Sequence, residues 1–483
     1  MDESLSRRRI FALLGGLSAA RLLTSAPLQA NDDTRFAHVS QAIERLNDDK
    51  PEQIRLLAPA GSEANLAPII REYRQLTGIS VKIDLAPVDD INTQLLLGQI
   101  SGGRAYDLVV VATFGIPDLV SADAIMPIDD LEARFPFARE SRESGLYRLG
   151  DRFGSHSYGP QVDGDLYVMF YNNAVLNDPD FVQRYKKIYG EPPTPAQTWD
   201  QLDRLMRVAQ RADRSAYGGL LFRTPRYIVW EFWSRMHAAG VLPFDNAMEP
   251  QLADSRSIAA LEAMISSSAS LHRRANAASL TENWELFCEG RTLCNIGWGG
   301  SQKFFARHSK DFPKGITVTQ LPGIQTPEGV LPIPYFNWGW NLVIPTGAPH
   351  PELGFLLAAL AVEPEVSTQA VAARDGFFDP FQPAHYTSEE IEKAYGREFL
   401  AVHQRGMQSA IPDLYISGHG QYMEVLSHYL VQADRGFIKP LEAMQAVTTK
   451  WRAITQTLGV KQQQQQWQSL LKSYPAAYLA ALA

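Results

Sequence analysis

The sequence predicts an α/β protein built of two lobes. Its 483 residues exceed the length of about 250–300 residues at which one hydrophobic core stops growing, so two cores are expected. Strand and helix patterns alternate early in the chain, which is typical of a parallel sheet covered by helices. Residues 108–111 are continuously apolar, as expected for a strand that is buried on both faces.

The first elements follow the order strand, helix, strand, helix, strand. Leu66, Ile69 and Tyr73 fall on one face of the first helix at helical spacing. Glycines close both helices, as is common at helix ends. We therefore expect strands at 53–61, 79–88 and 106–112, and helices at 63–78 and 91–103.

A second unit is expected to begin near residues 159–173, where Gly159, Pro160 and Gly164 interrupt the pattern. A proline-rich stretch then leads into a helix capped by Thr198. Further strands are predicted at 217–222, 292–298, 315–323 and 339–345, followed by a helix at 351–362 and a largely helical C-terminal part. The glutamine run at 461–470 is interpreted as a solvated helix or linker with no chemistry assigned.

The N-terminus has the pattern of a secretory signal. Three arginines at 7–9 precede a weak apolar stretch at 10–23, and small residues such as Ala30 offer a cleavage point. The stretch is too short for a membrane anchor, which needs roughly 20 apolar residues. Residues 6–11 also resemble the twin-arginine consensus, so residues 1–30 are predicted to be a twin-arginine-type signal peptide. The alternative is an ordinary exposed basic N-terminus.

Charge and cysteine content narrow the choice of partners. No cysteine follows the apolar stretch, so we expect no lipid anchor and a chain that is free in the periplasm. The net charge of −8 argues against nucleic acid or anionic lipid as a partner. Cys288 and Cys294 can form a short-loop disulfide in an oxidising compartment, and two unrelated thiols are the alternative. The cysteine spacing and the scattered histidines predict no metal site.

Six segments in this order resemble one protein family. They cover residues 57–83, 106–131, 166–176, 192–202, 287–298 and 336–361. No segment is specific by itself, but their order along most of the chain is similar to that of extracellular solute-binding proteins of family 1. These are maltose-binding-protein-like, periplasmic substrate-binding components of ABC transporters.

The resemblance implies the two-lobed periplasmic binding protein fold of type II, with an interlobe cleft and hinge strands. It assigns residues 31–163 plus 317–372 to lobe 1 and residues 164–316 plus 373–483 to lobe 2. It also implies a monomer without enzymatic activity or cofactor. Such a protein captures a small solute, such as a sugar or polyol, and delivers it to a permease and ATPase in the inner membrane.

A polyhydroxy ligand needs planar hydrogen-bonding groups for its hydroxyls and flat aromatic surfaces for its C–H faces. Such groups converge at the carboxyl ends of parallel strands. The candidate ligand-binding residues, several of them implied by the resemblance, are Ser62, Glu63, Thr113, Phe114, Asp165, Tyr227, Trp230, Trp298, Gly299, Trp338 and Trp340.

Each candidate also has an ordinary structural interpretation. Ser62 can cap a helix, Asp165 can bend the hinge, and the aromatic residues can belong to the core. Strand alternation is expected to place Trp338 and Trp340 on the same face. Trp298 is followed by two glycines, which allow a ligand to approach the backbone.

Two enzyme classes are alternatives. The twin-arginine route often carries redox enzymes, but the sequence has no G-x-G-x-x-G motif after a strand and no clustered cysteine ligands. A periplasmic glycoside hydrolase needs two carboxylates beside one bond. The acid pairs at 89–90 and 129–130 are more typical of helix starts. Arg223 and Arg226 keep an anionic ligand open.

Overall fold

The computed structural model describes residue 44 and residues 50–482, apart from 103–105, 136–146, 214 and 313. All of these belong to the unit His38–Ala483. The predicted signal peptide at 1–30 lies outside the described residues.

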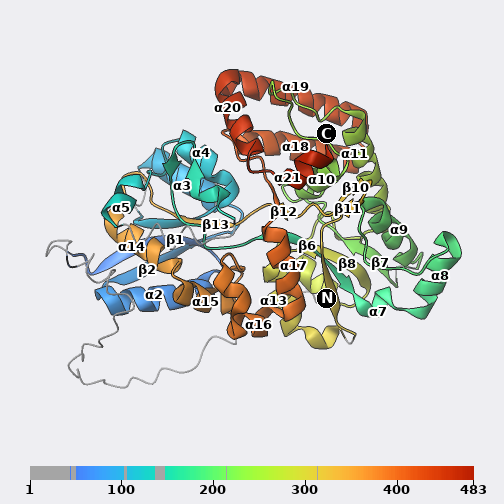
Figure 1. Cartoon of the computed structure of the whole chain (residues 1–483), viewed down its shortest axis with the longest axis horizontal. Coiled ribbons are helices and arrows are strands. Elements are labelled where there is room, and N and C mark those ends of the chain that lie inside the picture. The colour runs from blue at the N-terminus through green and yellow to red at the C-terminus, as the bar shows by residue number, and fades with distance from the viewer. Residues whose placement is uncertain are drawn as a thin grey trace, which may run out of the picture. The chain divides into compact units, whose positions relative to one another are not determined.

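The first sheet contains the three strands predicted for the N-terminal part. Its order is β13-β3-β1-β2, in which β1 (Gln53–Pro59), β2 (Ser80–Ala86) and β3 (Leu108–Ala112) are parallel and β13 (Trp340–Val343) is antiparallel to β3. Helices α2 (Glu63–Thr77), α3 (Ile91–Ser101), α14 (Pro351–Ala361) and α15 (Pro364–Ala372) pack on this sheet or on one another (Figure 1). Leu108 and Val111 are fully buried, which confirms the prediction of a strand covered on both faces.

Short elements follow β3. They are η2 (Thr113–Gly115), α4 (Ile116–Ser121), α5 (Asp129–Arg134), η3 (Leu149–Asp151), β4 (Arg152–Phe153) and β5 (His156–Ser157). The first two begin at the carboxyl end of β3, so they lie where a ligand is expected in a parallel sheet.

The second sheet has the order β14-β12-β6-β8-β7, and β9 also pairs with β6. Its strands are β6 (Leu166–Asn172), β7 (Tyr217–Leu220), β8 (Thr292–Gly297), β9 (Ile316–Gln320), β12 (Tyr335–Phe336) and β14 (Ile411–Pro412). A hairpin of β10 (Ile324–Thr326) and β11 (Gly329–Leu331) lies outside this sheet.

The helices of this part are α7 (Asn173–Leu176), α8 (Pro179–Tyr189), α9 (Trp199–Ala209), α10 (Ile228–Ala238), α11 (Ser255–Ser267), α12 (Leu280–Cys288) and α13 (Gly299–Arg307), with the 3-10 turns η4 (Ser268–Ser270) and η5 (Ser309–Asp311). Thr198 caps α9 as predicted, in a capping box with Gln201.

The chain crosses between the two sheets three times. Residues 160–162 pair with β13 and β6 begins at Leu166, so the first crossing is at 163–165. The second lies at 337–339 between β12 and β13, and the third follows α15. The sequence predicts that the chain returns to lobe 1 at residue 317. In the structure β9 and β12 still belong to the second sheet, because both pair with β6. Strand character alone does not reveal which sheet a strand joins.

The C-terminal part is largely helical, as predicted. It contains η6 (Pro383–Thr387), α16 (Glu389–Tyr395), α17 (Arg397–Met407), α18 (His419–Asp434), α19 (Pro440–Leu458), α20 (Val460–Leu471) and α21 (Ala476–Ala481). The glutamine run forms α20, but its interpretation as a solvated helix is wrong for Gln463, which is fully buried. Trp467 on the same helix is also buried and anchors α20 to the core.

The structure corrects the proposed disulfide, because Cys288 and Cys294 are both free. Cys294 lies in the middle of β8, where its thiol donates a hydrogen bond to the Gly218 carbonyl oxygen at 3.3 Å. Cys288 is the last residue of α12. Burial raises the pKa of the Cys288 thiol to about 12 and that of Cys294 further still.

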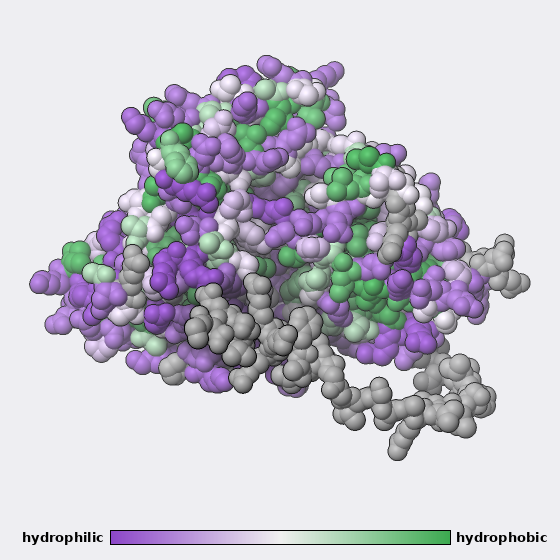
Figure 2. Space-filling view, turned by 180° about the vertical axis from the view of Figure 1, so that it is seen from behind, coloured by the Kyte–Doolittle hydropathy of each residue, from purple (hydrophilic) through white to green (hydrophobic). Residues whose placement is uncertain are grey.

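The surface is mostly hydrophilic on the face shown in Figure 2, where hydrophobic residues form small groups. Among the described residues, no single helix is both long and apolar enough to cross a membrane. The consecutive helices α14 and α15 meet the length and composition criteria only as a pair, and they are bent by 73°.

Candidate ligand-binding site

A buried carboxylate cluster ties the three crossings together. Asp163 and Asp165 come from the first crossing and Asp379 from the third, with one oxygen of each within 4.8 Å of the others. The backbone N–H of Gly339, in the second crossing, donates to Asp165 at 3.4 Å. Lys303, on α13, is also buried and donates to the Phe378 carbonyl oxygen at 3.1 Å.

The electrostatics of this cluster favour neutral carboxyl groups. Burial and then the neighbouring carboxylates raise the pKa values of Asp163 and Asp165 well above their ordinary range. Burial raises the pKa of Asp379 to about 6 and lowers that of Lys303 to about 8. Carboxylates are ligands for hard cations. Among the described residues, these three carboxyl groups lie close enough together to bind one cation jointly. The predicted ligand contact Asp165 therefore lies in the hinge.

Four of the predicted aromatic residues form one cluster between the lobes. The ring centroids of Trp230, Trp298 and Trp338 lie 5.3–6.1 Å apart, and Tyr227 lies 5.1 Å from Trp230. Each is buried. The Trp298 indole N–H donates to Asn337 at 2.8 Å. These distances are typical of aromatic pairs in edge or tilted contact.

Trp340 occupies a different position. It begins β13, is 1% exposed and packs against Phe377 at 5.6 Å. Its ring also contacts Trp338 at 5.8 Å. The preceding Gly339 has a φ of 73°, so the regular alternation on which the same-face prediction depends begins only after it.

A cavity of about 790 Å³ lies beside the aromatic cluster. It is lined from the first sheet's side by Asp89, Asn92, Phe114 and Asp118 among others, and from the second by Arg226, Trp230, Ser417, His419 and Met423 among others. Phe114 and Trp230 are the predicted site residues that line it. The Phe114 ring stacks on His419 at 5.1 Å, so the walls from both lobes touch here.

The remaining predicted residues have local roles in this structure. The Ser62 hydroxyl donates to the Pro59 carbonyl oxygen at 2.7 Å, and the Glu63 carboxylate accepts from the Gly61 N–H at 2.6 Å. Thr113 donates to the Asn341 side chain at 2.6 Å. The Gly299 N–H donates to Asp379 at 2.7 Å, which links α13 to the hinge cluster.

Several of the charged groups that line the cavity have close partners. Arg226 pairs with Asp89 at 3.2 Å, and the Tyr227 hydroxyl donates to the same carboxylate at 3.1 Å. Asp118 accepts the backbone N–H groups of Gly418 and Gly420 at 2.6 and 2.8 Å.

His419 and Arg223 are paired as well. Burial alone would lower the pKa of His419, but the charge and hydrogen bond of Asp413, 3.2 Å away, raise it. Arg223 is buried, and both terminal nitrogens of its guanidinium donate to the Glu231 carboxylate, Nη2 at 3.0 Å. Burial tends to raise the pKa of Glu231, but Arg223 and Arg235 lower it below its ordinary value.

Sequence reasoning missed Asp89, Asp118 and His419 as cavity residues. Asp89 follows the predicted second strand and Asp118 lies shortly after the third, so the rule that ligands bind at carboxyl ends could have identified both. His419 lies between two glycines at the start of α18. Its approach to Phe114 joins segments about 300 residues apart and leaves no local signal in the sequence.

Two α/β lobes joined by three crossings, with a cavity between them, define a two-lobed solute-binding protein. The profile of the bacterial extracellular solute-binding proteins matches residues 60–367, and the chain belongs to this family. The family resemblance predicted from the sequence is thereby confirmed. The protein is a binding protein and not an enzyme. No curated protein matches the sequence.

Solved structures with the same fold are ABC transporter solute-binding proteins. One from Agrobacterium radiobacter K84, in complex with ribitol, has a TM-score of 0.70 and 14% identity and covers 84% of this chain and 100% of that chain. One from Thermotoga lettingae TMO, bound to α-D-tagatose, has a TM-score of 0.68, 17% identity and coverages of 84% and 100%. One from Agrobacterium vitis S4, with D-mannitol, has a TM-score of 0.67, 16% identity and coverages of 85% and 99%.

Proposed function

We propose that the protein captures a neutral polyhydroxy solute, a sugar or polyol, between its lobes and delivers it to the permease of an ABC importer. The observation that carries the proposal is the aromatic cluster of Trp230, Trp298, Trp338 and Tyr227 beside a cavity whose one lining arginine, among the described residues, is paired with Asp89. Aromatic rings offer flat surfaces to the C–H faces of a sugar, and the polar wall offers partners to its hydroxyls.

Charge compensation favours a neutral ligand over an anionic one. Arg223 is engaged by Glu231 and Arg226 by Asp89. An anion would have to compete with a carboxylate that is already in place for either guanidinium. For Arg223, which is buried, loss of the partner is costly, because the remaining charge is uncompensated. The neutral ligands bound in the three similar structures, ribitol, α-D-tagatose and D-mannitol, support the same class.

The other predicted residues enter as proposals. Opening of the lobes separates Phe114 from His419 and exposes the aromatic faces to the solute. Ser62, Glu63, Thr113 and Gly299 lie at element starts or ends and act as secondary contacts. Asp165 and Trp340 act through the hinge and the first sheet.

We also propose the cellular setting. The protein acts as a monomer in the periplasm, reached by the twin-arginine route, and its partners are a permease and an ATPase. The family is extracellular by description, and the arginines at 7–9 support the route. Fusion of residues 1–30 to a reporter tests the route, because export that continues in a strain without the twin-arginine pore excludes it.

A thermal-shift screen tests the ligand class. Ribitol, D-mannitol, D-tagatose and maltose are each titrated against the protein, with gluconate and phosphate as anionic comparisons. A ligand that binds only the folded form raises the melting temperature, and 100 Kd of it stabilises by about 2.7 kcal/mol. We expect a neutral member to raise the midpoint and to change tryptophan emission. A shift with gluconate alone would contradict the neutral class, and chemical conversion of any solute would contradict a binding role.

A further inference from the structure

We propose that Asp118 is a positioning residue that holds the lobes closed, because it caps helix α18 of the opposite lobe. The glutamine helix α20 positions the loop before α18, which contains Ser417 and Gly418. This inference rests on the proposed function, because it explains how closure is stabilised. It assigns Asp118 to interlobe closure and gives the glutamine run a role.

The cap is supplied across the cleft. Asp118 lies on α4, after the third strand of the first sheet, and α18 belongs to the other lobe. The two carboxylate oxygens of Asp118 accept the N–H groups of Gly418 and Gly420 at 2.6 and 2.8 Å. The first N–H groups of a helix lack partners within the helix, and its N-terminus attracts negative charge. A carboxylate there stabilises the helix as an ordinary capping residue does.

Helix α18 has no side-chain cap of its own. Its N-cap position is Gly418, with a φ of 84°, and a glycine has no side chain to accept the hydrogen bonds. The cap therefore depends on lobe 1 being in contact. When the lobes separate, water replaces Asp118 at these N–H groups. The contact consequently favours the closed form over the open one.

Helix α20 forms hydrogen bonds with Ser417, in the loop before α18. The side-chain oxygen of Gln466 accepts the Ser417 N–H at 3.0 Å, and its amide nitrogen donates to the Ser417 hydroxyl at 3.0 Å. The buried Gln463 donates to the Ser417 carbonyl oxygen at 3.0 Å. The Ser121 hydroxyl of α4 then donates to Ser417 at 2.9 Å. Ser417 is thus fixed by α20 on one side and contacts lobe 1 on the other.

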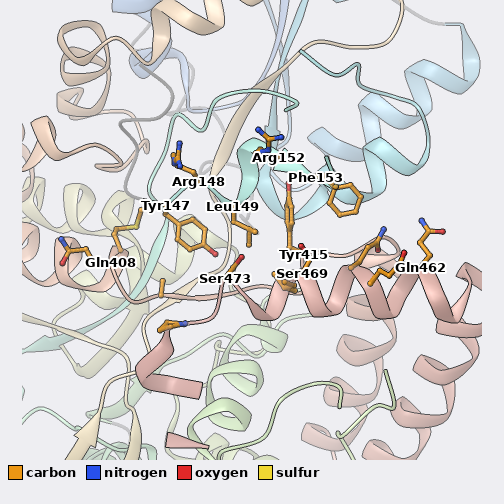
Figure 3. A pocket seen from close by; sticks show the side chains of 17 residues that line it. Tyr147, Arg148, Leu149, Arg152, Phe153, Gln408, Tyr415, Gln462, Ser469 and Ser473 are labelled. Carbon is orange, nitrogen blue, oxygen red and sulfur yellow. The ribbon is translucent and has the colours of Figure 1, made fainter. Parts of the chain in front are cut away.

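The loop needs this support because a second cavity lies behind it. This cavity measures about 760 Å³ and is lined by Phe153, Tyr415 and Gln466 among others (Figure 3). Tyr415 spans the lobes here, donating to the Gly150 carbonyl oxygen at 3.3 Å. Without the glutamine contacts, the loop could relax into this space and draw Gly418 away from Asp118.

The ion pair between Arg226 and Asp89 also joins the lobes. Arg226 and Asp89 have side chains that are 45% and 39% exposed, so water screens the pair. Arg226 also has a φ of 72°, an unfavourable conformation for a residue other than glycine. Asp118 has no positive φ, and both its oxygens meet backbone groups. We therefore assign to Asp118 a contribution to the free energy that stabilises the closed form.

The test measures the distance between the lobes in ligand-free protein. Spin labels are placed on the exposed positions Lys82, in lobe 1, and Lys187, in lobe 2, through K82C and K187C in a C288S background. Asp118→Ala should lower the closed-to-open ratio about 2- to 30-fold, the range of an N-cap removal. Asp130→Ala is the matched control, since Asp130 is an exposed lobe 1 carboxylate that lines neither cavity.

The glutamine helix has its own matched pair. Gln466→Ala should shift the distances in the same direction as Asp118→Ala but by less, whereas Gln468→Ala, at an exposed position of the same helix that lines neither cavity, should not. Melting curves confirm that each variant is folded. An unchanged distance distribution in Asp118→Ala overturns the proposal, and equal effects of the two glutamine variants overturn the role of α20.

Ribitol titration of the same labelled samples separates this proposal from the proposed function. Distances that shift in Asp118→Ala while ribitol, D-mannitol and D-tagatose all fail to close the wild type support the interlobe cap and contradict the solute class. Closure of both proteins by ribitol with the same affinity contradicts the cap, because a closing contact must contribute to ligand affinity.

Discussion

Asp165→Asn should change how stability depends on pH, because it removes one carboxyl group from the hinge cluster. Burial raises the pKa of Asp379 from 3.8 to about 6, and at about 1.4 kcal/mol per pKa unit this corresponds to about 3 kcal/mol. Asp163 and Asp165 shift in the same direction for the same reason.

The sign follows from proton binding. Between pH 3.8 and about 6 the folded protein holds a proton on Asp379 that the unfolded chain has released. Stability contributed by this group is therefore complete below pH 3.8 and is lost as pH rises through about 6. Lys303 acts at higher pH, because its pKa is lowered from 10.5 to about 8, so its unfavourable contribution disappears as pH rises through that interval.

The assay is urea unfolding at half-unit steps from pH 4 to pH 8, with the difference in unfolding free energy between Asp165→Asn and wild type plotted against pH. Titrating groups outside the hinge cluster cancel in this difference. We expect the variant to gain stability relative to wild type as pH rises, because the raised pKa of Asp165 no longer contributes. Asp130→Asn, at an exposed position, should give a flat difference. A flat difference for Asp165→Asn as well would refute the view that burial and neighbouring charges keep these carboxyl groups neutral.

Three further experiments test the core, the cysteines and the cleft. Arg235→Ala should lose about 3–5 kcal/mol of unfolding free energy in urea, because it leaves a buried ion network unpaired, whereas Arg204→Ala at an exposed pair should lose less than about 1 kcal/mol. Alkylation of unreduced, unfolded protein should label both Cys288 and Cys294 by mass spectrometry, and a disulfide would leave both unlabelled. Trp298→Ala should abolish the solute-dependent melting shift and also cost about 3–5 kcal/mol of stability, because the side chain is buried. Trp298→Phe, which retains most of the packing, separates the two effects.

The local features of the fold could be predicted because they depend on neighbours in the sequence. The apolar run at 108–111 implies burial on both sides, and Thr198 before an amphipathic stretch implies a capped helix. These signals span a few residues and depend on hydrogen bonds and side-chain periodicity within one element. The family resemblance then supplied the two-lobed arrangement, which no single element determines.

The features that could not be predicted depend on contacts between distant segments. The hydrogen bond from Gly418 to Asp118 joins residues 300 positions apart. The burial of Gln463 depends on Tyr422 and Ser417, which pack against a helix that composition alone describes as solvated. The second crossing was placed too early because an antiparallel edge strand has the same alternation whichever sheet it joins.

The aromatic cluster also explains why a hydroxylated solute should be preferred over an apolar one of similar shape. The indole N–H of Trp338 is buried, and no described residue accepts its hydrogen bond. An unsatisfied buried donor costs about 1–3 kcal/mol. A solute that enters the aromatic cluster when the lobes open and accepts from this group through a hydroxyl removes that cost, whereas an apolar ring that displaces the neighbouring side chains does not. The ring contacts that the solute replaces are worth about 0.5–1.5 kcal/mol each, so stacking on the solute largely offsets their loss. The net preference for the bound state then depends on hydrogen bonds such as this one, and we expect D-mannitol to bind more tightly than its deoxy analogues.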